Sequence, residues 1–340
     1  MKSKQLTNLI WYKDLNAEAR DDPGIYHSFM KSLATAINFI EDKLDPTWLM
    51  GSSGFAFRIW VNEVMCPSAM SIFNFSSILP EAIEQMGYHA IHISRFWNEA
   101  DKESERRAQA HAAIIEGIDR GVPAIVWDIA EAEWGLITGY DLENQIYHAL
   151  THNGKPTVLS FDKLGQNGIN ILSVAIPGEK NQRTRDQMIR NSLIAAVNHA
   201  EQKEWTDRPK YQNGLTAYDL WASLFEKWAM IVEAGKEDSI HPEIWNFAAY
   251  YVGHYYSARC HAREYLKSIA DGNDLLIKAA SRYENVSLAL QPVWDYFSQN
   301  RPIDAKTLHS LAEDIKSARV AEEEGIHFIK EYMDRVGGVV

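Results

Sequence analysis

The sequence predicts an α+β protein, because helical and strand patterns occupy separate stretches of the chain and do not alternate. Apolar residues at helical spacing come first, short apolar runs separated by turns follow, and helical spacing alone continues after Pro177-Gly178. We therefore expect an α+β domain of helices and a mainly antiparallel sheet in residues 1–178, and an all-α helical bundle in residues 179–340. The chain of 340 residues is long enough for two such domains.

Helices are expected before and between the first strands. Residues 26–44 carry apolar side chains every three or four positions, which predicts an amphipathic helix. The small residues of Met50–Gly54 predict a turn, and the aromatic-rich residues 55–64 predict a second, buried helix. A third helix ends at Met86, and residues 101–120 form a helix with one charged face.

Short apolar runs bounded by turn residues predict the strands of the sheet. They are residues 88–94, 122–128, 134–138, 144–150, 157–160 and 169–176. Asn153-Gly154 lies between two of these runs, and this dipeptide strongly favours a hairpin turn. Gly139-Tyr140-Asp141 follows another run and predicts a turn after it.

The second half of the chain shows helical spacing only. The expected helices are residues 183–203, 215–234, 241–270, 273–298 and 303–335, with a kink or break at Pro292. The third of these helices has aromatic side chains around too much of its circumference for one stripe. They are Trp245, Phe247, Tyr250, Tyr251, Tyr255 and Tyr256. Either this helix is central in the bundle, or one side contacts another domain or a second copy in a homodimer.

The net charge of −12 argues against nucleic acid and anionic membranes as partners, since it repels phosphate groups. Two cysteines, Cys66 and Cys260, make no disulfide framework and fit a reducing cytoplasm. We expect no signal peptide and no membrane span, because charges interrupt every apolar window. The predicted location is therefore cytoplasmic.

Few residues carry recognisable chemistry. Ser53 and Cys66 are candidate nucleophiles, and Glu133 is a candidate general base, but each has a structural alternative as a turn former, a small buried residue or a solvated acid. Asp141 is a candidate orienting group or, equally, a turn former. A single Glu324-x-x-His327 spacing lacks the second motif that a di-iron bundle needs, so we expect no metal and no cofactor.

Two segments carry a resemblance to a known family. They are Gly51–Arg58, which is Gly-Ser-Ser-Gly-Phe-Ala-Phe-Arg, and Gly121–Asp141, which contains Gly-Val-Pro and Trp-Gly-Leu-Ile-Thr-Gly-Tyr-Asp. The chain resembles the bacterial branch of the papain-like cysteine peptidase superfamily. That branch includes bacteriocin-processing peptidase-like domains and the N-terminal domain of the butirosin-biosynthesis acyltransferase family. The resemblance implies a nucleophile at the start of a buried helix, within Gly51–Gly54, and a histidine near Glu133 or Trp134.

This chain has Ser52 and Ser53 in the first place and no histidine in the second. A serine without a base is a poor nucleophile. The resemblance therefore implies a cleft that binds a small molecule or peptide without hydrolysing protein. Its expected lining is Ser52, Ser53, Phe55, Phe57, Trp134 and Tyr140. The alternatives are an acyltransferase or amide-processing enzyme that uses Ser53 or Cys66 with a histidine from elsewhere, and a structural homodimer.

Overall fold

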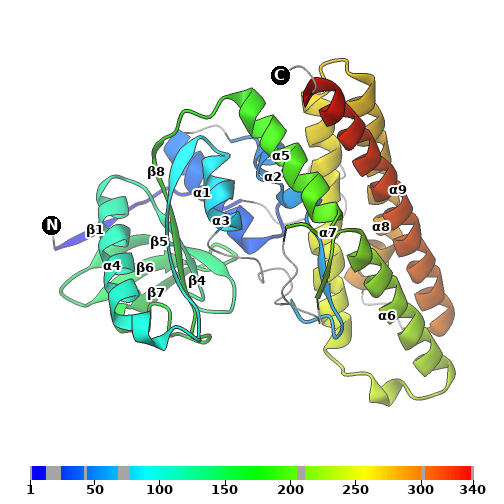
Figure 1. Ribbon diagram of the computed structural model, residues 1–340. Helices are drawn as coiled ribbons and strands as arrows, with labels where there is room; N and C mark the ends of the chain where they lie inside the picture. The colour runs from blue at the N-terminus through cyan, green and yellow to red at the C-terminus, as the bar shows by residue number, and fades with distance from the viewer. Residues whose placement is uncertain are drawn as a thin grey trace. The chain divides into compact units, whose positions relative to one another are not determined.

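A computed structural model describes residues 2–12, 24–41, 44–67, 77–204, 211–299 and 303–337 (Figure 1). The protein is α+β with an antiparallel sheet, as the sequence predicts. It divides into two compact units. Unit 1 comprises Met1–Asp14, His27–Leu49 and Asn74–Thr184, and unit 2 comprises Leu15–Tyr26, Met50–Phe73 and Arg185–Val340. Residues 50–67, which the sequence analysis assigned to the first domain, therefore belong to the same unit as the C-terminal helices.

Unit 1 contains a sheet with the strand order β3-β8-β4-β5-β6-β7. β1 pairs with the end of β5, on the same edge of β5 whose beginning pairs with β4. All strand pairs of this sheet are antiparallel. The strands are β1 (Ser3–Gln5), β3 (Tyr88–Arg95), β4 (Ala124–Trp127), β5 (Trp134–Asp141), β6 (Ile146–Leu150), β7 (Pro156–Ser160) and β8 (Leu172–Lys180). The predicted hairpin turn at Asn153-Gly154 connects β6 and β7, and Gly154 has a φ of 76° there.

The helices of unit 1 are α1 (Ser28–Glu41), α3 (Ile78–Glu84) and α4 (Glu103–Asp119), with short 3-10 turns at Ala100–Lys102 and Phe161–Lys163. α4 buries Ala110, Ile114 and Ile118 against the sheet, where Ile137 and Tyr147 belong to the same apolar cluster. α1 is buried over the ten consecutive residues Ser28–Ile37. The predicted helix is therefore present, but over that stretch its polar side chains are buried together with its apolar ones.

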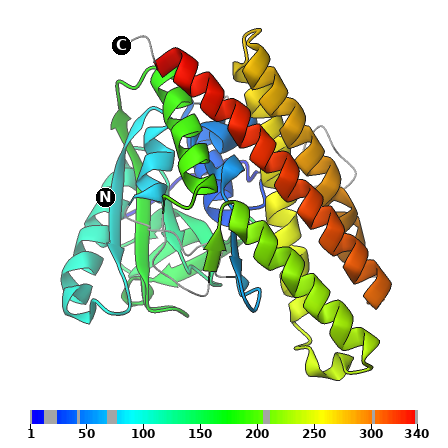
Figure 2. The same ribbon diagram turned by 45° about the vertical axis from the view of Figure 1, so that its right-hand side comes forward.

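Unit 2 is mainly helical, and Figure 2 shows α6, α7, α8 and α9 packed together. Its helices are α5 (Arg185–Ala200), α6 (Leu215–Glu233), α7 (Ile244–Ile269), α8 (Asp274–Ser298) and α9 (Ala305–Gly337), with a 3-10 turn at Glu237–Ser239. A two-stranded sheet joins β2 (Trp60–Asn62) to β9 (Tyr211–Asn213). α8 continues through Pro292 as one assigned helix.

The predicted helix at residues 55–64 is wrong. The chain instead forms a 3-10 turn at Phe55–Phe57, followed by β2. The buried Arg259 side chain takes the place of helical N–H groups, because it donates to the carbonyl oxygens of Phe57 at 3.2 Å and Arg58 at 2.8 Å. The same guanidinium donates to Glu322 at 2.7 Å, so both charges are paired inside unit 2.

The predicted turns at Met50–Gly54 and Gly139–Asp141 are each partly wrong. Met50, Gly51 and Ser52 complete α2 (Pro46–Ser52), and the turn begins only after them. Gly139, Tyr140 and Asp141 are the last residues of β5, because β6 pairs with them on one edge and β1 on the other. A Cβ atom at Gly139 would lie 2.6 Å from the Lys4 carbonyl oxygen, so only glycine lets β1 approach this closely.

The aromatic run of α7 lies largely inside unit 2. Tyr251, Tyr255 and Tyr256 are buried, and the ring of Trp245 contacts that of Trp228 edge-on at 5.3 Å. A homodimer contact by this helix stays a prediction. Among the helices in the described ranges, none combines the length and apolar character needed to cross a bilayer.

Candidate functional site

The predicted serine candidates lie in unit 2. Ser53 is 3% exposed; its hydroxyl donates to the Met50 carbonyl oxygen at 3.2 Å and accepts the Phe55 N–H at 3.4 Å. Both hydrogen bonds close the turn between α2 and the next residues, so Ser53 acts as a turn former. Ser52 is fully buried in α2.

The two phenylalanines expected to line a cleft are also buried in unit 2. Phe55 is 4% exposed and Phe57 is 1% exposed. The Phe57 ring packs edge-on against Tyr283 at 5.4 Å. Their burial, and for Phe57 the contact with Tyr283, is what apolar packing side chains show.

The imidazole of His199, 140 residues away along the chain, is hydrogen-bonded to the backbone that follows this turn. Its Nε2 atom accepts the Ile59 N–H at 2.8 Å, and its Nδ1 atom is 2.9 Å from Glu204, which also binds Arg58. Burial alone would raise the pKa of Glu204, but the charges of Arg58 and His199 hold this pKa well below its usual value. The cluster therefore stabilises the Phe55–Trp60 segment, and both imidazole nitrogens are already in use.

Cys66 is partly buried, and its backbone carbonyl oxygen accepts a hydrogen bond from the Tyr251 hydroxyl at 2.8 Å. This contact fixes the backbone after β2 to α7 within unit 2. Among the described residues, no group of three or more histidine, cysteine, aspartate or glutamate side chains is arranged to hold a metal ion.

Two of the candidate residues in unit 1, Asp141 and Tyr140, form hydrogen bonds within the local structure. The Asp141 carboxylate accepts the backbone N–H groups of Glu143 at 2.9 Å and Asn144 at 3.1 Å, and these bonds lower its pKa. Asp141 thus shapes the turn between β5 and β6. Tyr140 is 1% exposed and donates to Asp119 at 2.8 Å; this hydrogen bond, followed by burial, raises the pKa of the phenol.

Glu133 and Trp134 meet a residue that the sequence analysis missed. Ser28 is the first residue of α1 and is 4% exposed. Its hydroxyl donates to Glu133 Oε2 at 2.5 Å and accepts the backbone N–H of Trp134 at 3.2 Å. The Phe29 ring packs edge-on against Trp134 at 5.2 Å beside this contact. The hydroxyl of Ser28 and the carboxylate of Glu133 are therefore hydrogen-bonded at the point where α1 and β5 both begin.

Ser28 belongs to a polar stripe on α1, which we define as Ser28, Lys31, Ser32 and Thr35. Their spacing of three, four and seven residues places them on one face of the helix. All four are buried, with exposures of 4, 3, 0 and 1%. Burial lowers the pKa of Lys31 to about 8, although the nearby charge of Glu133 acts in the opposite direction. The Thr35 hydroxyl accepts the Tyr12 N–H at 3.2 Å.

The loop between β4 and β5 is held in place by Asp128. This residue is 3% exposed and has a φ of 59°, which is uncommon for a residue with a side chain. Its carboxylate accepts the N–H groups of Gly168 at 2.7 Å and Ile169 at 2.6 Å. Trp127, which precedes it, is 6% exposed and packs edge-on against Trp134 at 5.2 Å. The position of Glu133 is therefore set from both ends of the loop.

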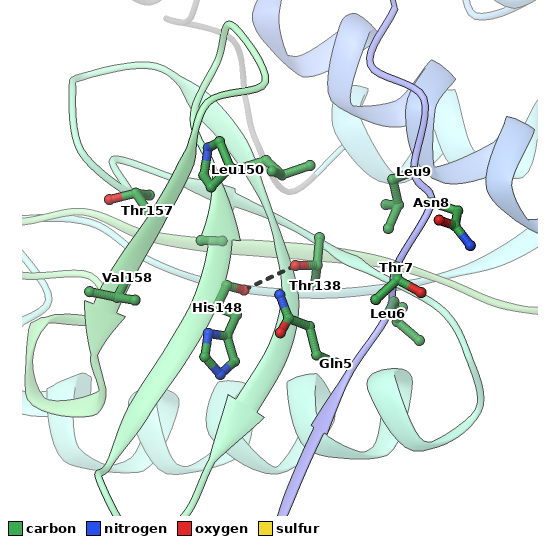
Figure 3. A pocket seen from close by; sticks show the side chains of 12 residues that line it. Gln5, Leu6, Thr7, Asn8, Leu9, Thr138, His148, Leu150, Thr157 and Val158 are labelled. Carbon is green, nitrogen blue, oxygen red and sulfur yellow. Dashed lines mark hydrogen bonds between the residues drawn. The ribbon is translucent and has the colours of Figure 1, made fainter.

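A separate groove of about 620 Å³ lies on the sheet of unit 1 (Figure 3). Its floor is formed by side chains of β5, β6 and β7, and one wall is the segment Gln5–Leu9. Thr138 on the floor donates to the carbonyl oxygen of His148 at 3.3 Å. Figure 3 shows this hydrogen bond with Gln5 beside it, and Val158 on the strand at the far side of the groove. The groove thus combines hydroxyl, amide and imidazole groups with aliphatic side chains.

No protein-family profile matches this chain, and no curated protein matches it significantly.

Proposed function

We propose that the protein binds a small molecule or a peptide and does not hydrolyse it, in a papain-like unit whose nucleophile and base are replaced. The acidic chain with two cysteines favours a cytoplasmic location for this activity. The observation that carries the proposal is the contact between Ser28 and Glu133 at 2.5 Å.

The resemblance described above implies a nucleophile at the start of a buried helix and a base near Glu133. Ser28, at the start of α1, fits that description better than Ser52 or Ser53, and Glu133 is its hydrogen-bond partner. In this pair a hydroxyl takes the place of the thiol that the resemblance implies, and a carboxylate takes the place of the imidazole. A carboxylate, with a reference pKa of about 4.3 against about 6.5 for histidine, is a weak base for activating a serine at neutral pH.

The environment of Ser28 also favours binding over catalysis. Its donor proton is bound to Glu133, its oxygen accepts the Trp134 N–H, and only 4% of the residue is exposed. An attacking hydroxyl must instead present a lone pair to a substrate carbonyl within about 3–3.5 Å. The groove in Figure 3 supplies the concave surface that a binding protein needs.

Active-site labelling tests the absence of a nucleophile. The native protein is treated at neutral pH with a fluorophosphonate, which reacts with activated serines, and separately with iodoacetamide. We expect no fluorophosphonate adduct on Ser28 or Ser53, and no faster alkylation of Cys66 in the native protein than in urea. A stable adduct on either serine, or rapid native alkylation of Cys66, would refute the proposal and favour the acyltransferase alternative.

A further inference from the structure

We propose that the groove between Gln5–Leu9 and the strands β5–β7 binds an uncharged peptide segment in an extended conformation. This inference rests on the binding function proposed above and names its place and ligand class. It uses only residues of unit 1, and none of the predicted nucleophiles lines the groove.

The chemistry of the lining indicates an uncharged ligand. None of the twelve lining residues is an aspartate, glutamate, lysine or arginine, although the protein as a whole has 24% charged residues. A charged group brought into the groove would lose hydration without meeting an opposite charge. Gln5, Thr7 and Asn8 carry side chains that can donate and accept hydrogen bonds, as an amide backbone requires.

The register of the sheet places one residue from each of four neighbouring strands in a row across the groove. Gln5 of β1 pairs with Gly139 of β5, Gly139 pairs with His148 of β6, and His148 pairs with Val158 of β7. The row therefore runs from an amide, through an imidazole, to an aliphatic side chain that is 58% exposed. An extended peptide lying across the strands presents backbone amide groups and side chains along its whole length, so it can contact both kinds of surface at once.

The wall of the groove is held in a defined position. The Leu6 N–H donates to the Thr138 carbonyl oxygen at 2.7 Å, after which the segment leaves β5. Asn8 adopts a left-handed φ of 65° on this path. Farther on, Trp11 packs against the β6–β7 turn so closely that a Cβ atom at Gly154 would lie 2.5 Å from its ring. A wall anchored at both ends lowers the ordering cost of binding.

The lining also argues against a carbohydrate. Sugar rings bind commonly by stacking on aromatic faces, and the lining contains no tryptophan, tyrosine or phenylalanine. Leu9, Leu150 and Val158 instead supply the small aliphatic contacts that suit peptide side chains such as valine or leucine.

The test uses the full chain and a terminally blocked neutral tetrapeptide, acetyl-Ala-Val-Thr-Leu-amide. Nuclear magnetic resonance titration follows the backbone amides of residues 5–9, β6 and β7. We expect saturable shifts there, and an affinity at least about tenfold lower for the Val158→Glu variant, because its carboxylate would face the uncharged ligand. Val320→Glu is the matched control, since Val320 lies on α9 and is 53% exposed, against 58% for Val158.

Saturable binding that is equally strong in the wild type and in Val158→Glu would overturn this inference and leave the proposed function standing. Absence of saturable shifts in the groove at the solubility limit of the peptide would also overturn it, as would preferential binding of a lysine- or glutamate-containing analogue. Failure of the proposed function is recognised separately, by fluorophosphonate labelling of Ser28 or Ser53 or by rapid native alkylation of Cys66.

Discussion

Replacing Lys31 by methionine is expected to stabilise the protein near neutral pH. Lys31 is 3% exposed on α1, and burial lowers its pKa from 10.5 to about 8. One pKa unit corresponds to about 1.4 kcal/mol, so a shift of roughly 2.5 units corresponds to about 3 kcal/mol. This is the free energy by which burying the ammonium ion disfavours folding. Methionine has a similar length without the charge, and Lys31→Met should recover part of that energy.

The pH dependence distinguishes this explanation from a simple packing effect. The unfolded chain keeps the lysine proton up to about pH 10.5, whereas the folded chain releases it near pH 8. Between these values the unfolded state binds more protons, so the wild type gains stability as the pH rises. The advantage of Lys31→Met should therefore be largest below pH 8 and should shrink towards pH 10.5.

Urea denaturation of both proteins from pH 7 to pH 10 measures this difference. Lys227→Met serves as the control, because Lys227 is an exposed lysine on α6. We expect an advantage of about 1–3 kcal/mol for Lys31→Met at pH 7 and almost none for the control. A Lys31→Met protein that is less stable than the wild type at pH 7 would refute the reasoning. So would an advantage that does not change with pH.

Three further outcomes are expected. Ser28→Ala should lower stability in urea by about 1–2 kcal/mol, because it removes the bond to Glu133 and leaves the Trp134 N–H without its acceptor; an unchanged midpoint would contradict this. Gly139→Ala should loosen β1, since its Cβ atom would lie 2.6 Å from the Lys4 carbonyl oxygen, and amide exchange at Leu6 should accelerate; unaltered protection would count against the close approach. His92 of β3 is partly buried, and desolvation lowers its pKa to about 4, so it should stay neutral to near that pH; an imidazole resonance titrating near pH 6.5 would show that the ring is solvated.

The strands of unit 1 could be predicted because each is a compact apolar run between turn residues. β4 and the β6–β7 hairpin lie close to their expected bounds for that reason. β1 could not be predicted, since Ser3–Gln5 has no apolar pattern and is a strand only because β5 offers it an edge. Pairing with both β1 and β6 extends β5 through Asp141, where the local sequence favoured a turn.

The 55–64 segment shows how a distant side chain overrides a local pattern. Its aromatic residues are compatible with a buried helix, and burial is what the structure shows for Phe55, Phe57 and Trp60. The backbone conformation depends on Arg259, about 200 positions later, whose guanidinium binds the carbonyl oxygens of Phe57 and Arg58. No local pattern contains that information.

The polar stripe on α1 carries a signal that the sequence analysis did not use. Ser28, Lys31, Ser32 and Thr35 have helical spacing, which normally indicates a face in water. In α1 the same spacing forms a polar surface inside the protein, because these residues are buried. The sequence pattern is the same for an exposed and a buried polar face, so only the fold distinguishes them.

The charges of Glu133 and Lys31 interact at that surface. The carboxylate favours the protonated form of the buried lysine, and without it burial would lower the Lys31 pKa further. An imidazole in place of Glu133 would remove this compensating negative charge and, when protonated, would add a repulsive positive one. The residues that surround the start of α1 are therefore adapted to a carboxylate at position 133. This mutual dependence is a physical reason to regard the absence of a histidine there as part of a consistent arrangement around Ser28.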